Sequence, residues 1–251
     1  MKYKNYIFDL YGTLIDIETN EEKHSLWKTL ADLYACFGAV YEPKELKKRF
    51  KYLDKEARKK TSEQLGVTHS EIKLEKVFLQ LYKEKTDESS RKIENEDLFA
   101  EMLANTFRVV SRKNLRLFPE TLHVLETLKE NGCKIYLLSN AQAIFTRPEI
   151  HLMGIDKYFD VIYISSDFDV KKPEKIFLQT LMEQESLNPA ETVMIGNEME
   201  SDVKIAVLCQ IDGIFINLLH EDSEAIGKRS EKAGIQQSYT EIEDIGEVLN
   251  Y

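Results

Sequence analysis

The sequence has few cysteine, proline and glycine residues and no long apolar run. Five prolines and ten glycines among 251 residues exclude a collagen-like, linker-rich or low-complexity chain. No stretch approaches the roughly 20 apolar residues of a membrane span, and the chain reaches Asp9 before any apolar run long enough for a signal peptide. The three cysteines are odd in number and lack metal-ligand spacing, so we expect small buried side chains in a reducing cytoplasm (Cys36, Cys133 and Cys209).

Positive charge is also in short supply. Lysine and arginine total 34 residues against 44 aspartates and glutamates, which gives a formal net charge of -10. Because this field repels phosphate backbones and anionic lipids, we expect neither nucleic acid nor a membrane as a partner. A small anionic ligand therefore has to be bound by local positive charge. Hydrophobic residues make up 43% of the chain, which suits one large domain or a core with an inserted lobe.

Residues 21–112 carry apolar side chains at helical spacing and contain few glycines or prolines. One stripe is formed by Leu26, Leu30, Leu33 and Phe37, and a second begins after Pro43. The spacing predicts an all-helical lobe. The acidic residues at the hinge of this lobe are interpreted as carboxylates that open a helix rather than as residues that set specificity (Asp16, Glu18, Glu21 and Glu22).

The rest of the chain alternates between short apolar runs and helical patterns. The run at Tyr6–Phe8 predicts a first buried strand, and further strands are expected at 134–138, 159–164, 192–195 and 213–217. This alternation predicts an α/β fold with a doubly wound, mainly parallel, Rossmann-like sheet. We expect residues 1–17 and 114–251 to form this core and residues 18–113 to form a helical cap inserted after the first strand.

Polar signatures follow four of the expected strands. They are Asp9-Leu10-Tyr11-Gly12-Thr13, Ser139-Asn140, Lys172-Pro173 and the acidic run from Gly196 to Asp202. Each alone is typical of a turn or a helix cap. Ligands of open α/β sheets bind beyond the carboxyl ends of the strands, so together the four segments predict one site.

This ordered set resembles the haloacid dehalogenase-like hydrolase superfamily, and specifically its members with a helical cap after the first motif. The resemblance covers roughly residues 5–15 and 115–217, with no specific match inside the cap. It implies that Asp9 is a nucleophile that forms a covalent intermediate, and that Lys172 supplies positive charge beside it. It also implies that Thr13, Ser139 and Asn140 help to bind the transferred group.

The resemblance further implies a magnesium ion. Its ligands would be Asp9, the backbone carbonyl of Tyr11, Asn197 and Asp202, all of them oxygen donors of the kind that magnesium prefers. In such an acidic protein, a cation and Lys172 are the evident means of accepting an anionic substrate.

Two residues depart from the pattern of the family's phosphatases. Tyr11 stands where they have a second Asp that acts as general acid and base, and a phenol is a poor base at neutral pH. Asn197 stands where they have a metal-binding Asp. Both departures resemble the metal-free dehalogenase branch. That branch, however, has Ser and Asp at the positions of Ile195 and Glu200, and an Arg in the first cap helix, whereas the first arginine here is Arg49.

Three hypotheses therefore stand. The leading one is a magnesium-dependent phosphatase of a small phosphorylated metabolite, with an aspartyl-phosphate at Asp9 and Tyr11 in the catalytic set. The second is hydrolytic dehalogenation of a 2-haloacid at Asp9 without metal. The third is a member that binds a ligand or a protein partner without turnover. The oligomeric state stays open.

Overall fold

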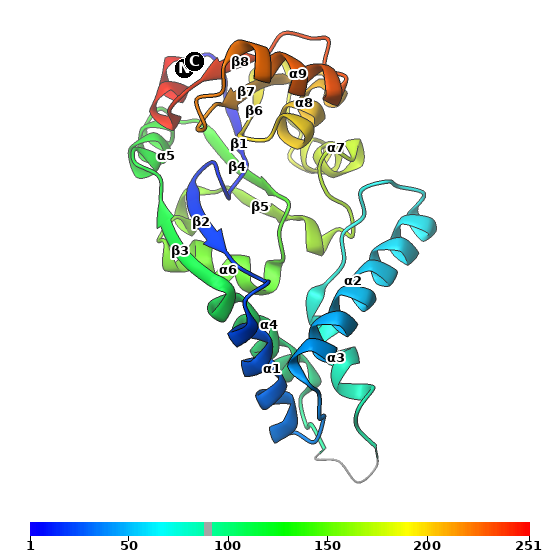
Figure 1. Ribbon diagram of the computed structural model, residues 1–251. Helices are drawn as coiled ribbons and strands as arrows, with labels where there is room; N and C mark the ends of the chain where they lie inside the picture. The colour runs from blue at the N-terminus through cyan, green and yellow to red at the C-terminus, as the bar shows by residue number, and fades with distance from the viewer. Residues whose placement is uncertain (88–91) are drawn as a thin grey trace.

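The computed structural model describes residues 1–87 and 92–251. Its main element is a six-stranded sheet of order β5-β4-β1-β6-β7-β8, in which every neighbouring pair is parallel (Figure 1). The strands are β1 (Asn5–Phe8), β4 (Lys134–Ser139), β5 (Val161–Ile164), β6 (Thr192–Gly196), β7 (Asp212–Ile216) and β8 (Thr240–Ile242). Because β1 lies between β4 and β6, the segments that follow these three strands meet at one edge of the sheet. The predicted parallel α/β sheet is confirmed.

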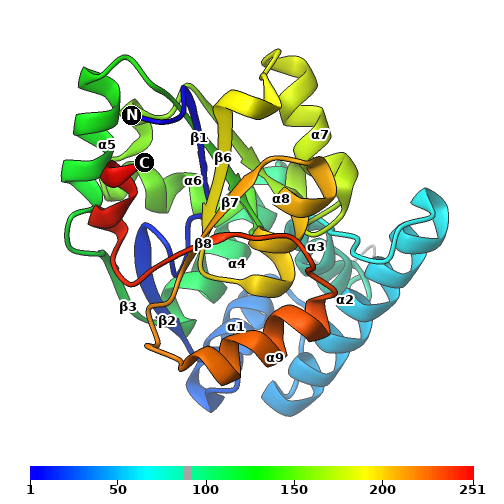
Figure 2. The same ribbon diagram turned by 90° about the horizontal axis from the view of Figure 1, so that it is seen from above.

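Helices cover both faces of this sheet. Tyr6 and Phe8 of β1 join a hydrophobic cluster with α5 and α6, whereas Ile7 joins another with α7 and α8. Successive strand side chains point to opposite faces, so this split defines a doubly wound arrangement. Figure 2 shows α5 and α6 on one side of the strands and α7 and α8 on the other. The helices are α5 (Thr121–Glu130), α6 (Ala143–Leu152), α7 (Lys175–Gln184), α8 (Lys204–Cys209) and α9 (Ser223–Ala233).

Four helices gather into a lobe at the other end of the molecule (Figure 1). They are α1 (His24–Cys36), α2 (Pro43–Leu65), α3 (Leu74–Lys83) and α4 (Glu96–Ser111). The lobe has its own aromatic core, in which the ring of Phe50 lies 5.2 Å from that of Phe78 and 5.5 Å from that of Phe107. Residues 88–91 of the expected cap lie outside the described residues.

A two-stranded antiparallel sheet links the lobe to the core. It pairs β2 (Ile15–Thr19), through which the chain enters the lobe, with β3 (Arg112–Leu117), through which it returns. The interpretation of Asp16 and Glu18 as helix-start carboxylates was therefore wrong, because both lie in β2. Asp16 Oδ2 accepts hydrogen bonds from Asn114 Nδ2 at 2.9 Å and Arg116 Nε at 2.8 Å. This sheet straddles the expected boundaries at residues 18 and 113.

Other details differ from expectation at single positions. All three cysteines are free thiols, but Cys36 is exposed at the end of α1 while Cys133 and Cys209 are buried. A π-helical turn, η4 (Met199–Val203), precedes α8 where one continuous helix was expected. Among the described helices, none is both long and apolar enough to cross a membrane. The remaining short turns are η1 (Asp156–Tyr158), η2 (Ser165–Asp167), η3 (Pro189–Glu191) and η5 (Ile245–Asn250).

Candidate active site

Three predicted site residues from distant segments meet in a buried ion cluster. Lys172 Nζ lies 2.6 Å from Asp9 Oδ1 and 2.7 Å from Asp202 Oδ1. Asp9 follows β1 and Asp202 lies in the turn after β6, so the parallel pairing of these two strands places both carboxylates at one edge of the sheet. Asp9 is 7% exposed, Asp202 1% and Lys172 2%. One ammonium faces two carboxylates, which leaves one negative charge in excess inside the protein.

Burial and ion pairing shift the pKa values of this cluster in opposite directions. Loss of hydration raises the pKa of Asp9 despite the attraction of Lys172, and it raises the pKa of Asp202 to about 7. Burial alone would lower the pKa of Lys172, but Asp202 and Asp9 together raise it. The ammonium therefore stays charged, and the excess negative charge calls for a proton or a further cation.

Asn140 fixes the backbone of the lysine. Its Nδ2 donates to the carbonyl oxygen of Lys172 at 3.0 Å, and the N–H of Lys172 donates to its Oδ1 at 2.7 Å. Both ends of the Asn140 amide therefore hold the backbone of Lys172 in place. Ser139, the last residue of β4, is 1% exposed and lies directly before it.

Asn197 packs against the loop that follows Asp9. Thr13 Oγ1 donates to Asn197 Oδ1 at 3.3 Å. Gly12 has a φ of +82°, and a Cβ at this position would lie 2.5 Å from Asn197 Nδ2. Only glycine therefore permits both this backbone conformation and the close approach of the amide.

The chemistry of the predicted metal ligands fits magnesium in part. Asp9, the carbonyl of Tyr11 and the amide of Asn197 are oxygen donors beside a cluster with excess negative charge, which suits a hard divalent cation. Asp202 differs, because one of its oxygens accepts from Lys172 and the other from the N–H of Glu198 at 3.0 Å. Within residues 1–87 and 92–251, no group of three His, Cys, Asp or Glu side chains is arranged to hold a metal ion.

Tyr11 is directed to a second buried ion cluster, which the sequence did not predict. Its hydroxyl donates to Glu149 and lies 3.1 Å from Thr146 Oγ1, both on α6. Burial and the charge of Glu149 raise the pKa of the phenol. The place of Tyr11 in the catalytic set stays a prediction, and in this structure its hydroxyl proton is donated to Glu149.

Glu149 also binds two arginines. It is 3% exposed and accepts from Arg108 Nε at 2.8 Å, Arg108 Nη2 at 2.9 Å and Arg112 Nη1 at 2.9 Å. Arg108 belongs to α4 of the helical lobe and Arg112 to β3. One carboxylate thus holds the lobe, its connecting strand and the loop after Asp9 together, with one positive charge in excess.

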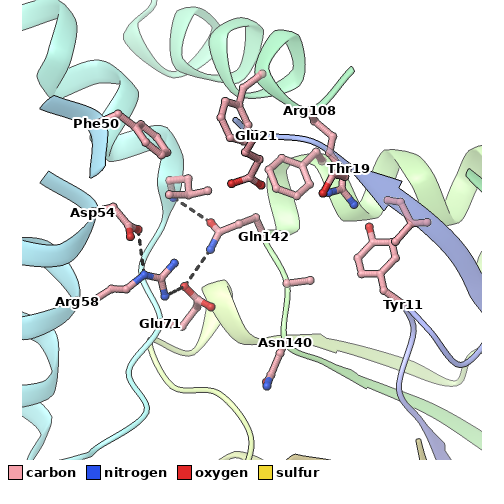
Figure 3. Close-up of a pocket in the computed structure, with 15 residues that line it drawn as sticks. Tyr11, Thr19, Glu21, Phe50, Asp54, Arg58, Glu71, Arg108, Asn140 and Gln142 are labelled. Carbon is pink, nitrogen blue, oxygen red and sulfur yellow. Dashed lines mark hydrogen bonds and ion pairs between the residues drawn. The ribbon is translucent and has the colours of Figure 1, made fainter. Parts of the chain in front are cut away.

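A cavity of about 310 Å³ lies between the helical lobe and the loops after β1 and β4 (Figure 3). Tyr11 and Asn140, both predicted site residues, line it from the core. Glu21, Asp54 and Arg108 line it from β2–α1, α2 and α4. The sequence did not indicate that Asp54 and Arg108 face a cavity, because a charged residue in a helical pattern looks the same whether it faces solvent or a cavity. Glu21 was interpreted as a helix-start carboxylate, but it precedes α1 and lies outside its first turn.

The segment between α2 and α3 closes one side of this cavity. Glu71, which is 5% exposed, accepts from Arg58 of α2 and, at 3.0 Å, from Gln142 Nε2 of the core. Glu174 Oε1 accepts from the N–H groups of Thr68 at 2.8 Å and His69 at 2.7 Å. The lobe is thus bonded to the core on both sides of the cavity.

Comparison with known proteins defines the class. Residues 3–208 match the family model of haloacid dehalogenase-like hydrolases, so the chain belongs to this family of hydrolases. A curated relative is the glyceraldehyde 3-phosphate phosphatase of Methanothermobacter thermautotrophicus, which is 28% identical over 143 residues. That match covers 57% of this chain and 62% of the relative, so the chain spans less than two thirds of the relative's length.

Solved structures show the same fold along the whole chain. A 2-haloacid dehalogenase from Pseudomonas syringae superimposes with a TM-score of 0.68 at 16% identity and covers 99% of this chain and 97% of its own. A HAD phosphatase from Thermococcus onnurineus gives a TM-score of 0.59 at 21% identity and covers 98% of this chain and 96% of its own. At these identities the likeness establishes the fold.

Proposed function

We propose that this hydrolase is a magnesium-dependent phosphatase of a small phosphorylated metabolite. The observation that carries the proposal is the buried contact of Asp9 with Lys172, beside a cavity roofed by the helical lobe. The phosphatase relative supports the same reaction class. Residues 18–113 would act as the cap that excludes water and selects the substrate.

In the proposed reaction, a carboxylate oxygen of Asp9 attacks phosphorus. The bond from phosphorus to the alcohol oxygen breaks, and that oxygen takes a proton from solvent. Water then attacks the phosphorus of the aspartyl-phosphate, loses a proton to solvent, and the bond to Asp9 breaks to release inorganic phosphate. Lys172 would offset the charge of the phosphoryl oxygens, and Ser139 would donate a hydrogen bond to them. The Thr13 hydroxyl would do the same only by leaving Asn197 Oδ1, to which it donates in this structure.

The residues that would hold magnesium are Asp9, Tyr11 through its carbonyl, and Asn197. When bound, the ion supplies two positive charges that align and neutralise the phosphoryl group. Asp202 would act through Lys172, because both of its oxygens are already engaged. A cation at this position would also offset the one negative charge that remains when Lys172 pairs with both Asp9 and Asp202.

The test is hydrolysis of p-nitrophenyl phosphate with magnesium and with EDTA. We expect turnover with magnesium, its loss with EDTA, and its loss in Asp9→Asn. Asp32→Asn serves as the matched control, because this aspartate is exposed and pairs with Lys28 on the surface of α1. If magnesium gives no hydrolysis of this or any other generic phosphate ester, the proposal is wrong.

A second candidate is 2-haloacid dehalogenation. One observation favours it: Arg108, whose Nε and Nη2 pair with Glu149, lines the cavity and would provide a guanidinium there, which the first cap helix lacks. Tyr11 and Asn197 fit this branch as well. Halide release from 2-chloropropionate in EDTA, lost in Asp9→Asn, would support it. If neither reaction occurs, and cells with Asp9→Asn behave like cells with the unmodified chain, the chain binds a ligand or partner without turnover.

A further inference from the structure

A second cavity of about 310 Å³ lies between α2, α3 and a loop of the core, and it shares no lining residue with the cavity beside the candidate site. Three lysines line it: Lys60 from the last turns of α2, and Lys73 and Lys76 from the start of α3. Among its lining residues, all of them in the described part of the chain, Asp169 of the core is the only acid. Three ammonium groups and one carboxylate leave two positive charges in excess around this cavity, which we call the lysine cavity.

The three lysines of this cavity have no partner in the part of the chain that the structure describes. Their side chains make no hydrogen bond and no ion pair there. Other lysines of α2 do pair, since Lys51 binds Glu22 and Lys59 binds Glu63. The chain has 44 acidic residues against 34 basic ones, so its composition does not force three lysines to share a cavity without counter-charge. Their mutual repulsion is unfavourable, and a bound anion would offset it.

Two of the lysines also lie where a helix disfavours positive charge. Lys73 is the N-cap of α3, and Lys76 lies in its first turn. The N-terminal end of a helix carries a partial positive charge, so a cation stabilises the last turn of a helix and not the first. Glu75 is the acidic residue of this turn, but it is not among the residues that line the cavity. An anion in the cavity would therefore interact favourably with the helix dipole as well as with the ammonium groups.

The rest of the lining suits a phosphate group. Thr61 offers a hydroxyl and Gln64 an amide, and neither side chain has a hydrogen bond within residues 1–87 and 92–251. Both groups can donate to phosphate oxygens, and lysine binds phosphate as a point charge. Ile72 and Val77, which are 6% and 3% exposed, add an apolar side to the cavity. A volume of about 310 Å³ is at the small end of ligand sites.

We propose that the lysine cavity binds a small, multiply charged phosphate compound of the pyrophosphate type, at a site separate from the candidate active site. The three lysines would neutralise the phosphate oxygens, and Thr61 would donate a hydrogen bond to one of them. Asp169 offsets one of the three positive charges, which leaves two for the ligand. This inference does not depend on the proposed phosphatase function, because an inactive chain would bind the anion equally well.

A ligand in the lysine cavity would lie beside the segment that leads to Lys172. The carbonyl oxygen of Asp169 accepts from the N–H of Glu71 at 2.8 Å, and the N–H of Lys171 donates to the carbonyl oxygen of His69 at 3.0 Å. These two bonds join the connection between α2 and α3 to the core segment that directly precedes Lys172. A bound anion would therefore add a contact between lobe and core near the candidate site without occupying that site.

The test is calorimetric titration of the full chain with sodium pyrophosphate, in EDTA and at low salt. We expect the double variant Lys73→Gln with Lys76→Gln to bind at least about tenfold more weakly, the effect of one charge-assisted hydrogen bond. Lys60→Gln, on the other helix, should also weaken binding. Inorganic phosphate should bind about tenfold more weakly than pyrophosphate, because it reaches fewer of the lysines at once. If the unmodified chain does not bind pyrophosphate, or if the double variant binds it equally well, the proposal is wrong.

A matched control and a stability measurement separate a site from a general charge effect. Lys55→Gln with Lys232→Gln removes the same charge at exposed positions outside the cavity, so an equal loss of affinity there would overturn the proposal. In urea unfolding without ligand, Lys73→Gln with Lys76→Gln should be at least as stable as the unmodified chain, because both lysines oppose the helix dipole. Pyrophosphate should raise the unfolding midpoint of the unmodified chain and of the control but not of this variant. A lower midpoint of the variant without ligand would assign these lysines to the fold and refute the inference.

Discussion

Glu149 should contribute far more to the stability of the fold than its place in an ordinary helix suggests. Its carboxylate is buried and accepts three hydrogen bonds from Arg108 and Arg112, and a fourth from the hydroxyl of Tyr11. Replacement by glutamine keeps the volume and one acceptor oxygen but removes the charge. The Glu149→Gln variant therefore tests electrostatics with little change in packing.

The size of the effect follows from what the substitution leaves behind. Removing one partner of a buried ion pair costs about 3–5 kcal/mol, because the remaining charge is uncompensated. Arg108 keeps 11% of its side chain exposed and Arg112 keeps 22%, so Arg112 can recover hydration more easily. We expect a loss of about 3 kcal/mol in the free energy of unfolding, a large share of the ~5–15 kcal/mol typical of a folded protein.

Urea unfolding followed by circular dichroism measures this loss. The matched control is Glu224→Gln, whose pair with Lys228 on α9 is 78% and 72% exposed and should be worth less than about 0.5 kcal/mol. A second variant, Glu149→Gln with Arg108→Met, should recover part of the stability, because it removes the orphaned charge. If Glu149→Gln lowers the free energy of unfolding by less than about 1 kcal/mol with an unchanged m-value, the charge of Glu149 does not stabilise the fold as argued above.

Two further predictions concern the same region. Gly12→Ala forces a side chain into a left-handed backbone and against Asn197, so it should abolish hydrolysis of p-nitrophenyl phosphate, whereas Gly227→Ala, where a Cβ meets nothing within 4 Å, should not. The second concerns pH. Although burial opposes it, Arg108 holds the pKa of Glu149 below its ordinary value of 4.5, so the stability contributed is complete above that pH and is lost as the pH falls through the folded value. The difference in unfolding free energy between the unmodified chain and Glu149→Gln should therefore shrink below pH 4.5 and stay constant above it.

The convergence of the site residues at one edge of the sheet could be predicted from the sequence, because parallel strands all end at the same edge. Once β1, β4 and β6 are neighbours, Asp9, Ser139 and Asn197 have to emerge at the same edge, whatever separates them along the chain. Lys172 follows from the same rule through β5, and its ammonium indeed lies 2.6 Å from Asp9. The roles of these residues in catalysis stay predictions.

The connection between the lobe and the core could not be predicted with the same rule. Ile15 and Ile17 of β2 alternate with Asp16 and Glu18, which is a period-two signal, but five residues are too few to outweigh the helical pattern that follows. Helical periodicity likewise places Arg108 on a helix without naming its partner 41 residues away. Such pairings depend on how two helices pack, and a single sequence does not contain that information.

The local charge around Asp9 could not be predicted from the net charge of the chain either. The total of -10 predicts only that an anion needs local help. In the structure, the local net charge depends on how many partners each buried charge has. Lys172 pairs with two carboxylates, which leaves a negative charge, whereas Glu149 pairs with two arginines, which leaves a positive charge. The loop after Asp9 thus lies between a negative and a positive cluster. A phosphate approaching Asp9 meets the negative one, which is the physical reason to expect a magnesium requirement.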